Sequence, residues 1–77
     1  MSVNTSVELA QLRERLRNGN ARATRERAHV SRAEVAADLG VHETTVEKWE
    51  TGKRSPRGRL AFLYGRLLHE LDEIGTR

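Results

Sequence analysis

The segment from about 58 to 74 constrains the fold most strongly, because its apolar residues recur every three or four positions. At about 100° per residue this spacing places them on one broad face of a helix, whereas the side chains of a strand alternate between two faces. The residues of this face are Leu60, Leu63, Tyr64, Leu67, Leu71 and Ile74. Phe62 falls roughly opposite the centre of that face, where one core cannot easily bury it as well. We therefore expect Phe62 to be exposed unless the amino-terminal helix or a second subunit covers it.

Two shorter helices are predicted in the first part of the chain. Thr5 and Glu8 fit a capping box, in which two side chains satisfy backbone N–H groups at a helix start. A helix near 6–17 follows and ends at 18–20, and its apolar stripe consists of Leu9, Leu12 and Leu16. The next helical segment, 21–28, has only small or weakly apolar residues on its inner face. The leucine stripe is expected to cover that thin face or to cover another subunit.

A pair of short helices comes next. A second capping box, Ser31 with Glu34, begins a helix that Gly40 ends in a left-handed turn. After about one residue another helix is predicted over 42–50, with Gly52 as its stop. The residues that these two helices are expected to bury are Val35, Ala36, Leu39, Val46 and Trp49.

The size and composition of the chain fit one small domain. Its 77 residues show no strand-like alternation, internal repeat or low-complexity tract, so we predict an all-α domain of five helices. The absence of cysteine excludes disulfides and thiolate metal sites. The longest apolar run, Leu60–Leu63, is far shorter than the roughly 18 residues that a membrane span needs. No charged and apolar leader opens the chain, so we expect a cytoplasmic protein that does not bind membranes.

A basic block at residues 51–59 directly follows the second helix of the pair. It holds four Lys and Arg residues and no acidic residue, in a chain whose net charge is only +3. Taken alone, such a block fits either polyanion binding or a solvated basic loop. Two short helices joined by a tight glycine turn are the components of a helix-turn-helix module, whose second helix enters the major groove of DNA. With Val46 and Trp49 turned inward, the side chains that point outward are those of Glu43, Thr44, Glu47 and Lys48.

Between about residues 21 and 71, eight or more positions agree at fixed offsets with one family pattern. They are Ser31, Glu34-Val35-Ala36, Leu39-Gly40-Val41, Thr45-Val46, Trp49-Glu50, Gly52-Lys53-Arg54 and Pro56. Through them the chain resembles the phage repressor and Cro family of helix-turn-helix proteins, also called the xenobiotic-response-element class. The resemblance implies a lambda-repressor-like DNA-binding domain at residues 20–74, to which residues 1–19 add an amino-terminal amphipathic helix.

The resemblance also implies roles for individual residues. The positions from which the family reads bases are occupied by Glu43, Thr44 and Lys48. The positions that contact the DNA backbone or the minor groove are occupied by Arg32, His42, Thr51, Lys53, Arg54 and Arg57. His42 stands where the family usually has a serine or threonine cap, so the cap is weakened by about 0.5–1 kcal/mol or His42 is free to touch phosphate. Arg25 and Glu50 match a buried ion pair between the first helix of the family's core and the recognition helix.

Some of these side chains also have an ordinary structural interpretation. Trp49 is a candidate for stacking on bases, but its position favours the core. Glu43 and Glu47 repel phosphate, so at least one of them is expected to be solvated, while Glu43 is alternatively an acceptor for a cytosine amino group. Lys48 and Thr44 are candidates for contacts with bases or phosphates.

Catalysis finds little support in the sequence. His29, His42 and His69 lie at no metal-ligand spacing. The glycines at 52, 58 and 65 are isolated and follow helices, so they form no phosphate-binding loop of the nucleotide-binding type. We expect no metal, no cofactor and no enzymatic activity.

The sequence therefore predicts a sequence-specific transcription regulator that binds double-stranded DNA, as a Cro-like or repressor protein of a phage or mobile element. The alternative is a protein-interaction module, such as an antitoxin-like or polymerase-binding adaptor, with secondary DNA binding. A homodimer is expected at least on DNA, with Phe62 at the contact between subunits. Packing of the leucine stripe within one chain is the alternative to a dimer surface there.

Overall fold

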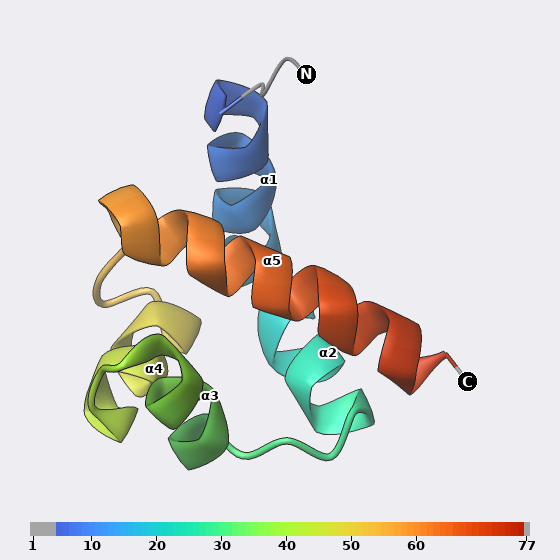
Figure 1. The fold of residues 1–77 in the computed structure, drawn as a ribbon. Coiled ribbons are helices and arrows are strands. Elements are labelled where there is room, and N and C mark those ends of the chain that lie inside the picture. Colours follow the sequence, from blue (N-terminus) through green and yellow to red (C-terminus); the bar gives the residue numbers. More distant parts are fainter. Residues whose placement is uncertain (1–4, 77) are drawn as a thin grey trace.

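In the computed structural model, which describes residues 5–76, every regular element is an α-helix. The helices are α1 (Thr5–Arg17), α2 (Asn20–Arg27), α3 (Arg32–Leu39), α4 (Glu43–Glu50) and α5 (Gly58–Gly75). Helix α5 runs across the molecule, α1 and α2 pack against it, and α3 and α4 form a pair near its first turns (Figure 1). The predicted all-α fold of five helices is confirmed. Over the described residues, no helix combines the length and the apolar character needed to cross a membrane.

The core draws buried side chains from all five helices. Val35 of α3 and Val46 of α4 are completely buried, and Leu68 of α5 is buried between the helices with them. The Trp49 side chain is 3% exposed, and its ring centroid lies 5.1 Å from that of Tyr64. Trp49 is thus a core residue, as its place on the inner face predicted, and it offers no stacking platform to a base.

The buried face of α5 differs from the predicted one. Ala61 and Leu68 are buried, whereas Leu63 is 37% exposed and Ile74 48% exposed. Helix α1 packs near the side of α5 that carries Ala61 and Gly65, and a groove stays open between the two helices there. The sequence pattern counted only large apolar residues, so it placed the centre of the face too far from this side.

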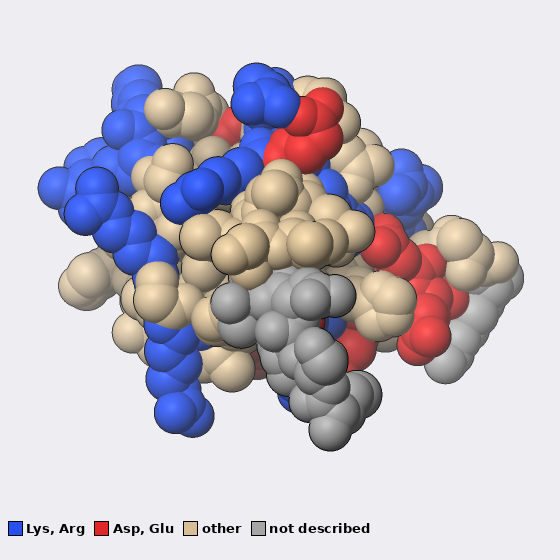
Figure 2. Space-filling model, turned by 90° about the horizontal axis from the view of Figure 1, so that it is seen from above, with Lys and Arg blue, Asp and Glu red and all other residues tan. Residues whose placement is uncertain are grey.

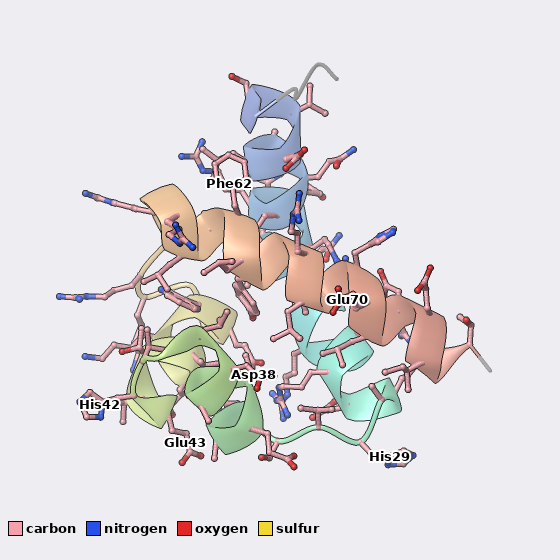
Figure 3. All side chains as sticks on the ribbon, in the orientation of Figure 1. His29, Asp38, His42, Glu43, Phe62 and Glu70 are labelled. Atoms are coloured by element: carbon pink, nitrogen blue, oxygen red, sulfur yellow. The ribbon has the colours of Figure 1, made fainter. Side chains whose placement is uncertain are left out.

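Phe62 is half-buried, in the angle between α1 and α5 (Figure 3). It lines a groove of about 460 Å³ between these helices together with Leu9 and Leu12. The ring was expected to be covered by the amino-terminal helix or by a second subunit. In the described chain its neighbour is α1, the amino-terminal helix.

The leucine stripe of α1 packs within the chain. Leu12 is 3% exposed and belongs to the core, and Leu9 and Leu16 are partly buried against it. The thin inner face of α2 consists of Ala21 and the completely buried Thr24. Of the two expected partners for the stripe, the structure therefore has α1 covering α2 and α5 of its own chain.

A polar network joins α1, α2 and α5. The Arg15 guanidinium donates hydrogen bonds to Thr24 Oγ1 at 2.7 Å and to Asp72 Oδ1 at 2.9 Å. The Thr24 hydroxyl donates to the same Asp72 oxygen at 2.9 Å. Arg15 Nε also donates to Asn20 Oδ1 at 2.6 Å. Arg15 takes part in three of these bonds, so they hold one face of α1 toward α2 and α5.

Helices α2, α3 and α4 all end in the same way. A residue with positive φ follows each helix, and these residues are His29 (60°), Gly40 (71°) and Gly52 (80°). The next N–H then returns to a carbonyl five residues earlier, as in a Schellman motif. These bonds run from Val30 to Arg25 at 3.1 Å, from Val41 to Ala36 at 3.0 Å and from Lys53 to Lys48 at 2.9 Å. The predicted stops at Gly40 and Gly52 are confirmed, whereas the positive φ after α2 falls on a histidine, which does not signal it in the sequence.

One of the two predicted capping boxes is observed among the described side chains. Ser31 and Glu34 form the second box, with the Ser31 N–H donating to Glu34 Oε1 at 2.8 Å and the Glu34 N–H donating to Ser31 Oγ at 3.0 Å. The hydrogen bond that the Glu34 carboxylate accepts from the Ser31 N–H lowers the pKa of Glu34 below its ordinary value. Helix α1 begins at Thr5, but the box of Thr5 and Glu8 involves a side chain outside those that are described.

Candidate nucleic-acid interface

The exposed face of α4 is defined by what the helix buries. Val46 and Trp49 turn inward at a spacing of three residues. The exposed side chains of α4 form two neighbouring rows, each with two residues one helical turn apart. The rows are Glu43 with Glu47 and Thr44 with Lys48. The three predicted base-reading residues therefore share one exposed face, which has the size and polarity to enter a major groove.

His42 holds the N-cap position of α4 with extended backbone angles, φ −78° and ψ 151°, but its side chain makes no capping bond. The cap that serine or threonine supplies elsewhere is therefore missing here. His42 is exposed and projects beside Glu43 from the side of the pair that faces away from α5 (Figure 3). This position leaves the imidazole free to approach a phosphate.

The loop after α4 offers side chains rather than backbone donors. The N–H groups of residues 51 to 54 all return to carbonyls at the end of α4, at distances from 2.9 to 3.3 Å. The Thr51 hydroxyl also donates to the Glu47 carbonyl at 2.9 Å. Lys53 and Arg54 are exposed, and Pro56 is buried and anchors the loop. Among the loop residues predicted to grip phosphate, Lys53 and Arg54 are therefore free to do so, whereas Thr51 already caps the helix.

Arg32 and Arg57 lie at the starts of the helices before and after α4. Arg32 is the first residue of α3 and is half-buried. Arg57 is the exposed N-cap residue of α5, and its side chain makes no capping bond. Both guanidinium groups therefore belong to helix starts that flank α4 in the sequence.

Arg25 and Glu50 tie α2 to the end of α4. The Arg25 Nε donates to Glu50 Oε2 at 2.7 Å, and the Nη2 donates to Oε1 at 3.1 Å. A third bond runs from Arg25 Nη1 to the Val30 carbonyl at 3.0 Å. The two side chains are only 9% and 2% exposed. The hydrogen bond to Glu50 raises the pKa of Arg25 above its ordinary value, and the geometry of the pair holds the end of α4 against α2.

The Tyr64 hydroxyl lies in the same interior region. It is buried and has no hydrogen-bond partner among the described residues. Burial raises the pKa of this hydroxyl, and the Glu50 carboxylate raises it further. Tyr64 therefore stays neutral and serves the core through its ring.

On one face of the molecule, many basic side chains lie toward one end. In the space-filling view, Lys and Arg gather toward the end that holds the α4–α5 loop, while a group of Asp and Glu lies toward the end of α5 (Figure 2). Lys53 and Arg54 are exposed in the loop that directly follows α4. A polyanion is therefore drawn to that end of the protein.

Within residues 5–76, no three His, Cys, Asp or Glu side chains are close enough to hold a metal ion. His29 and His42 project from opposite ends of the lower part of the molecule in Figure 3.

Comparison with protein families agrees with this geometry. A family model described as helix-turn-helix, of the Cro/C1 type, matches residues 22–74. No curated protein and no solved structure gives a significant match to the chain. The matched residues run from α2 to the last turns of α5 and contain the whole of α3, α4 and the basic loop. The chain therefore belongs to the Cro/C1-type helix-turn-helix family of DNA-binding proteins.

Proposed function

We propose that the protein is a transcription regulator that binds a specific double-stranded DNA operator, as a Cro-like or repressor protein of a phage or mobile element. It acts in the bacterial cytoplasm, where its operator lies. The observation that carries this proposal is the exposed polar face of α4, held by the buried Arg25–Glu50 pair and bordered by a basic loop. A rigid polar helix next to phosphate-binding side chains is the arrangement that reads bases in a major groove.

The proposed contacts divide into two kinds. Glu43, Thr44 and Lys48 face base edges, where a lysine suits guanine and a glutamate suits the amino group of cytosine. The residues that hold the DNA backbone or enter the minor groove are Arg32, His42, Lys53, Arg54 and Arg57, with Thr51 as the weakest candidate because its hydroxyl caps α4. The first kind supplies specificity, and the second supplies affinity for any sequence.

Enrichment from a pool of randomised duplexes tests this function. The protein is mixed with the pool at about 0.15 M salt, and bound duplexes are amplified and sequenced over several rounds. We expect one motif to be enriched, with two related half-sites about one helical turn apart. A pool that stays random after selection, from protein that is folded by circular dichroism, would contradict sequence-specific binding.

The second candidate function, a protein-interaction module, is favoured by the groove between α1 and α5. Its apolar floor includes Leu9, Leu12 and Phe62, and its volume is about 460 Å³. An adaptor that works through this groove has no need for the basic loop. Retention on heparin at physiological salt favours the DNA regulator, and early elution favours the adaptor.

Dimerisation on DNA is a further part of the proposal. Phe62 is the predicted contact, but it is half-buried beside α1, whereas Leu63 and Ile74 are the exposed large apolar residues of α5. A glutamate introduced at a position in the contact between subunits places a charge in an apolar interface.

Phe62→Glu and Leu63→Glu are therefore compared by sedimentation with a full operator and with a half-site. Loss of two-to-one binding in Phe62→Glu alone supports the predicted contact, and loss in Leu63→Glu alone moves it to the outer face of α5. Monomers at every concentration, with one-to-one binding to the full operator, would reject the dimer.

A further inference from the structure

The carboxyl-terminal half of α1 lies beside the basic loop, although α1 precedes the residues that match the family. A hollow of about 440 Å³ opens between the two segments. Arg13, Leu16 and Arg17 line it from α1, and Trp49, Arg54 and Ser55 line it from α4 and the loop. Three guanidinium groups from segments far apart in the sequence thus surround one open space.

The packing of α1 fixes which of its side chains face this hollow. Leu16 is partly buried against the core, and Arg15 is held on another side by Thr24 and Asp72 at 2.7 and 2.9 Å. Arg13 and Arg17 are four residues apart, so they stand one above the other on a single helix face. Their direction toward the loop is therefore set by the fold.

Little negative charge competes for these arginines. The only acidic residue that lines the hollow is Glu50, whose side chain is 2% exposed and already paired with Arg25. Arg17 forms a pair with Glu14, but that pair lies in solvent and contributes little stability. In the part of the chain that the structure describes, neither Arg13 nor Arg54 is in an ion pair.

We propose that Arg13 and Arg17 bind DNA phosphates together with Arg54, so that α1 extends the phosphate-contacting surface beyond the helix-turn-helix. This inference rests on the proposed function. The ligand is a phosphodiester group, because a guanidinium offers two parallel donors to phosphate oxygens and keeps its charge at every working pH. The hollow lies beside the end of α4, so the phosphates it reaches belong to the backbone next to the groove that α4 occupies.

The salt dependence of DNA affinity tests the proposal. Dissociation constants of the wild type and of Arg13→Ala/Arg17→Ala are measured on one duplex over a range of salt concentrations. Each phosphate contact contributes about 0.9 to the slope of log affinity against log salt. Loss of two contacts therefore lowers the slope by about 1.8, so a fourfold rise in salt weakens the double variant about 12-fold less than the wild type.

Two control variants separate a local contact from the loss of net charge. Arg22→Ala/Arg66→Ala removes the same charge from exposed positions on α2 and α5 that do not line the hollow. Arg13→Lys/Arg17→Lys keeps the charge at the hollow. We expect both controls to retain nearly the wild-type slope, and circular dichroism to show all variants folded, since alanine and lysine favour helix.

Three outcomes would overturn the proposal. If Arg13→Ala/Arg17→Ala has the wild-type slope while Lys53→Ala has a smaller one, the proposed function stands and α1 has no part in it. If Arg22→Ala/Arg66→Ala lowers the slope equally, the effect comes from net charge alone. If the wild type shows no salt-dependent affinity for any duplex, the proposed function fails and this inference fails with it.

Discussion

Lys53 and Arg54 differ from Thr51 in what their side chains have left to bind. The Thr51 hydroxyl donates to the Glu47 carbonyl at the end of α4, whereas the two basic side chains reach into solvent. The family resemblance assigned all three to phosphate. The structure distinguishes Thr51 from the two basic residues by its hydrogen bond to α4. A sequence pattern contains no information on such a bond.

Lys53→Ala is expected to weaken binding to operator and to random DNA by the same factor. A phosphate contact carries no sequence information, and its loss lowers the salt slope by about 0.9. Titrations of both duplexes at several salt concentrations measure this. Thr51→Val is the matched comparison and is expected to leave the slope unchanged. An unaltered slope in both Lys53→Ala and Arg54→Ala would contradict the role of the loop.

At the scale of single elements, the end of α2 carries a strain that the other helix ends avoid. His29 has φ 60°, where the left-handed conformation costs a side chain about 1–2 kcal/mol and costs glycine almost nothing. His29→Gly is therefore expected to raise the free energy of unfolding by about 0.5–1 kcal/mol, after the greater backbone entropy of glycine is subtracted. Thermal unfolding measures the gain.

Gly40→Ala provides the control for His29→Gly. Gly40 has φ 71° and open space around its Cα, so alanine there is strained by the backbone angle rather than by a clash. We expect its melting temperature to fall. A lower melting temperature for His29→Gly would show that the imidazole contributes more than its backbone strain removes.

The link between α2 and α4 depends on Arg25. Its removal leaves the Glu50 carboxylate buried without a partner, which costs about 3–5 kcal/mol. That is a large part of the stability of a chain this small, at about 0.05–0.15 kcal/mol per residue. Urea unfolding of Arg25→Ala is expected to show this loss or an unfolded protein. Arg25→Met/Glu50→Leu, which removes both charges, is expected to recover much of the stability. An unchanged unfolding midpoint for Arg25→Ala would refute the role of the pair.

Elements with local signals were predictable from the sequence. The Ser31–Glu34 box, the stop at Gly40 and the inward pair of Val46 and Trp49 each depend on residues within one or two turns. The end of α2 was placed at about residue 28 and lies at Arg27, and its motif carries a histidine in place of glycine. Glycine marks a positive φ in a sequence, whereas histidine does not.

At the scale of the whole molecule, the sequence misplaced the inner face of α5. The observed inner face includes Ala61 and Leu68, whereas Leu63 lies at the surface. Where α1, α2 and α5 meet, hydrogen bonds join Arg15, Thr24 and Asp72, which are up to 57 residues apart. A helical wheel treats one helix at a time, so it contains no information on such contacts.

This network is expected to make stability depend on acid pH. Burial draws the pKa of Asp72 upward, but hydrogen bonds from Arg15 and Thr24 and the nearby charges hold it below its ordinary value. The stabilisation is therefore complete above the pKa of an unfolded aspartate, about 3.9, and is lost as pH falls through the lower folded value. Chemical unfolding between about pH 5 and pH 2 measures it.

Asp72→Asn is the matched variant for this pH dependence, because its amide does not titrate. Its free energy of unfolding is expected to fall less than that of the wild type on acidification. Glu34, whose pKa is also lowered, contributes equally to both proteins and cancels in the comparison. Parallel curves for the two proteins would show that Asp72 does not couple the helices to pH.

Reading of DNA by the exposed face of α4 is tested most directly by one comparison. The affinity of Lys48→Ala is measured at a single salt concentration on the selected operator and on random duplex, beside the wild type and Lys53→Ala. We predict that Lys48→Ala loses about 1–3 kcal/mol on the operator and much less on random DNA, because a base contact is lost only where its base is present. Lys53→Ala loses the same on both duplexes. Equal losses for Lys48→Ala on both would contradict base reading by this face and would make Lys48 another phosphate contact.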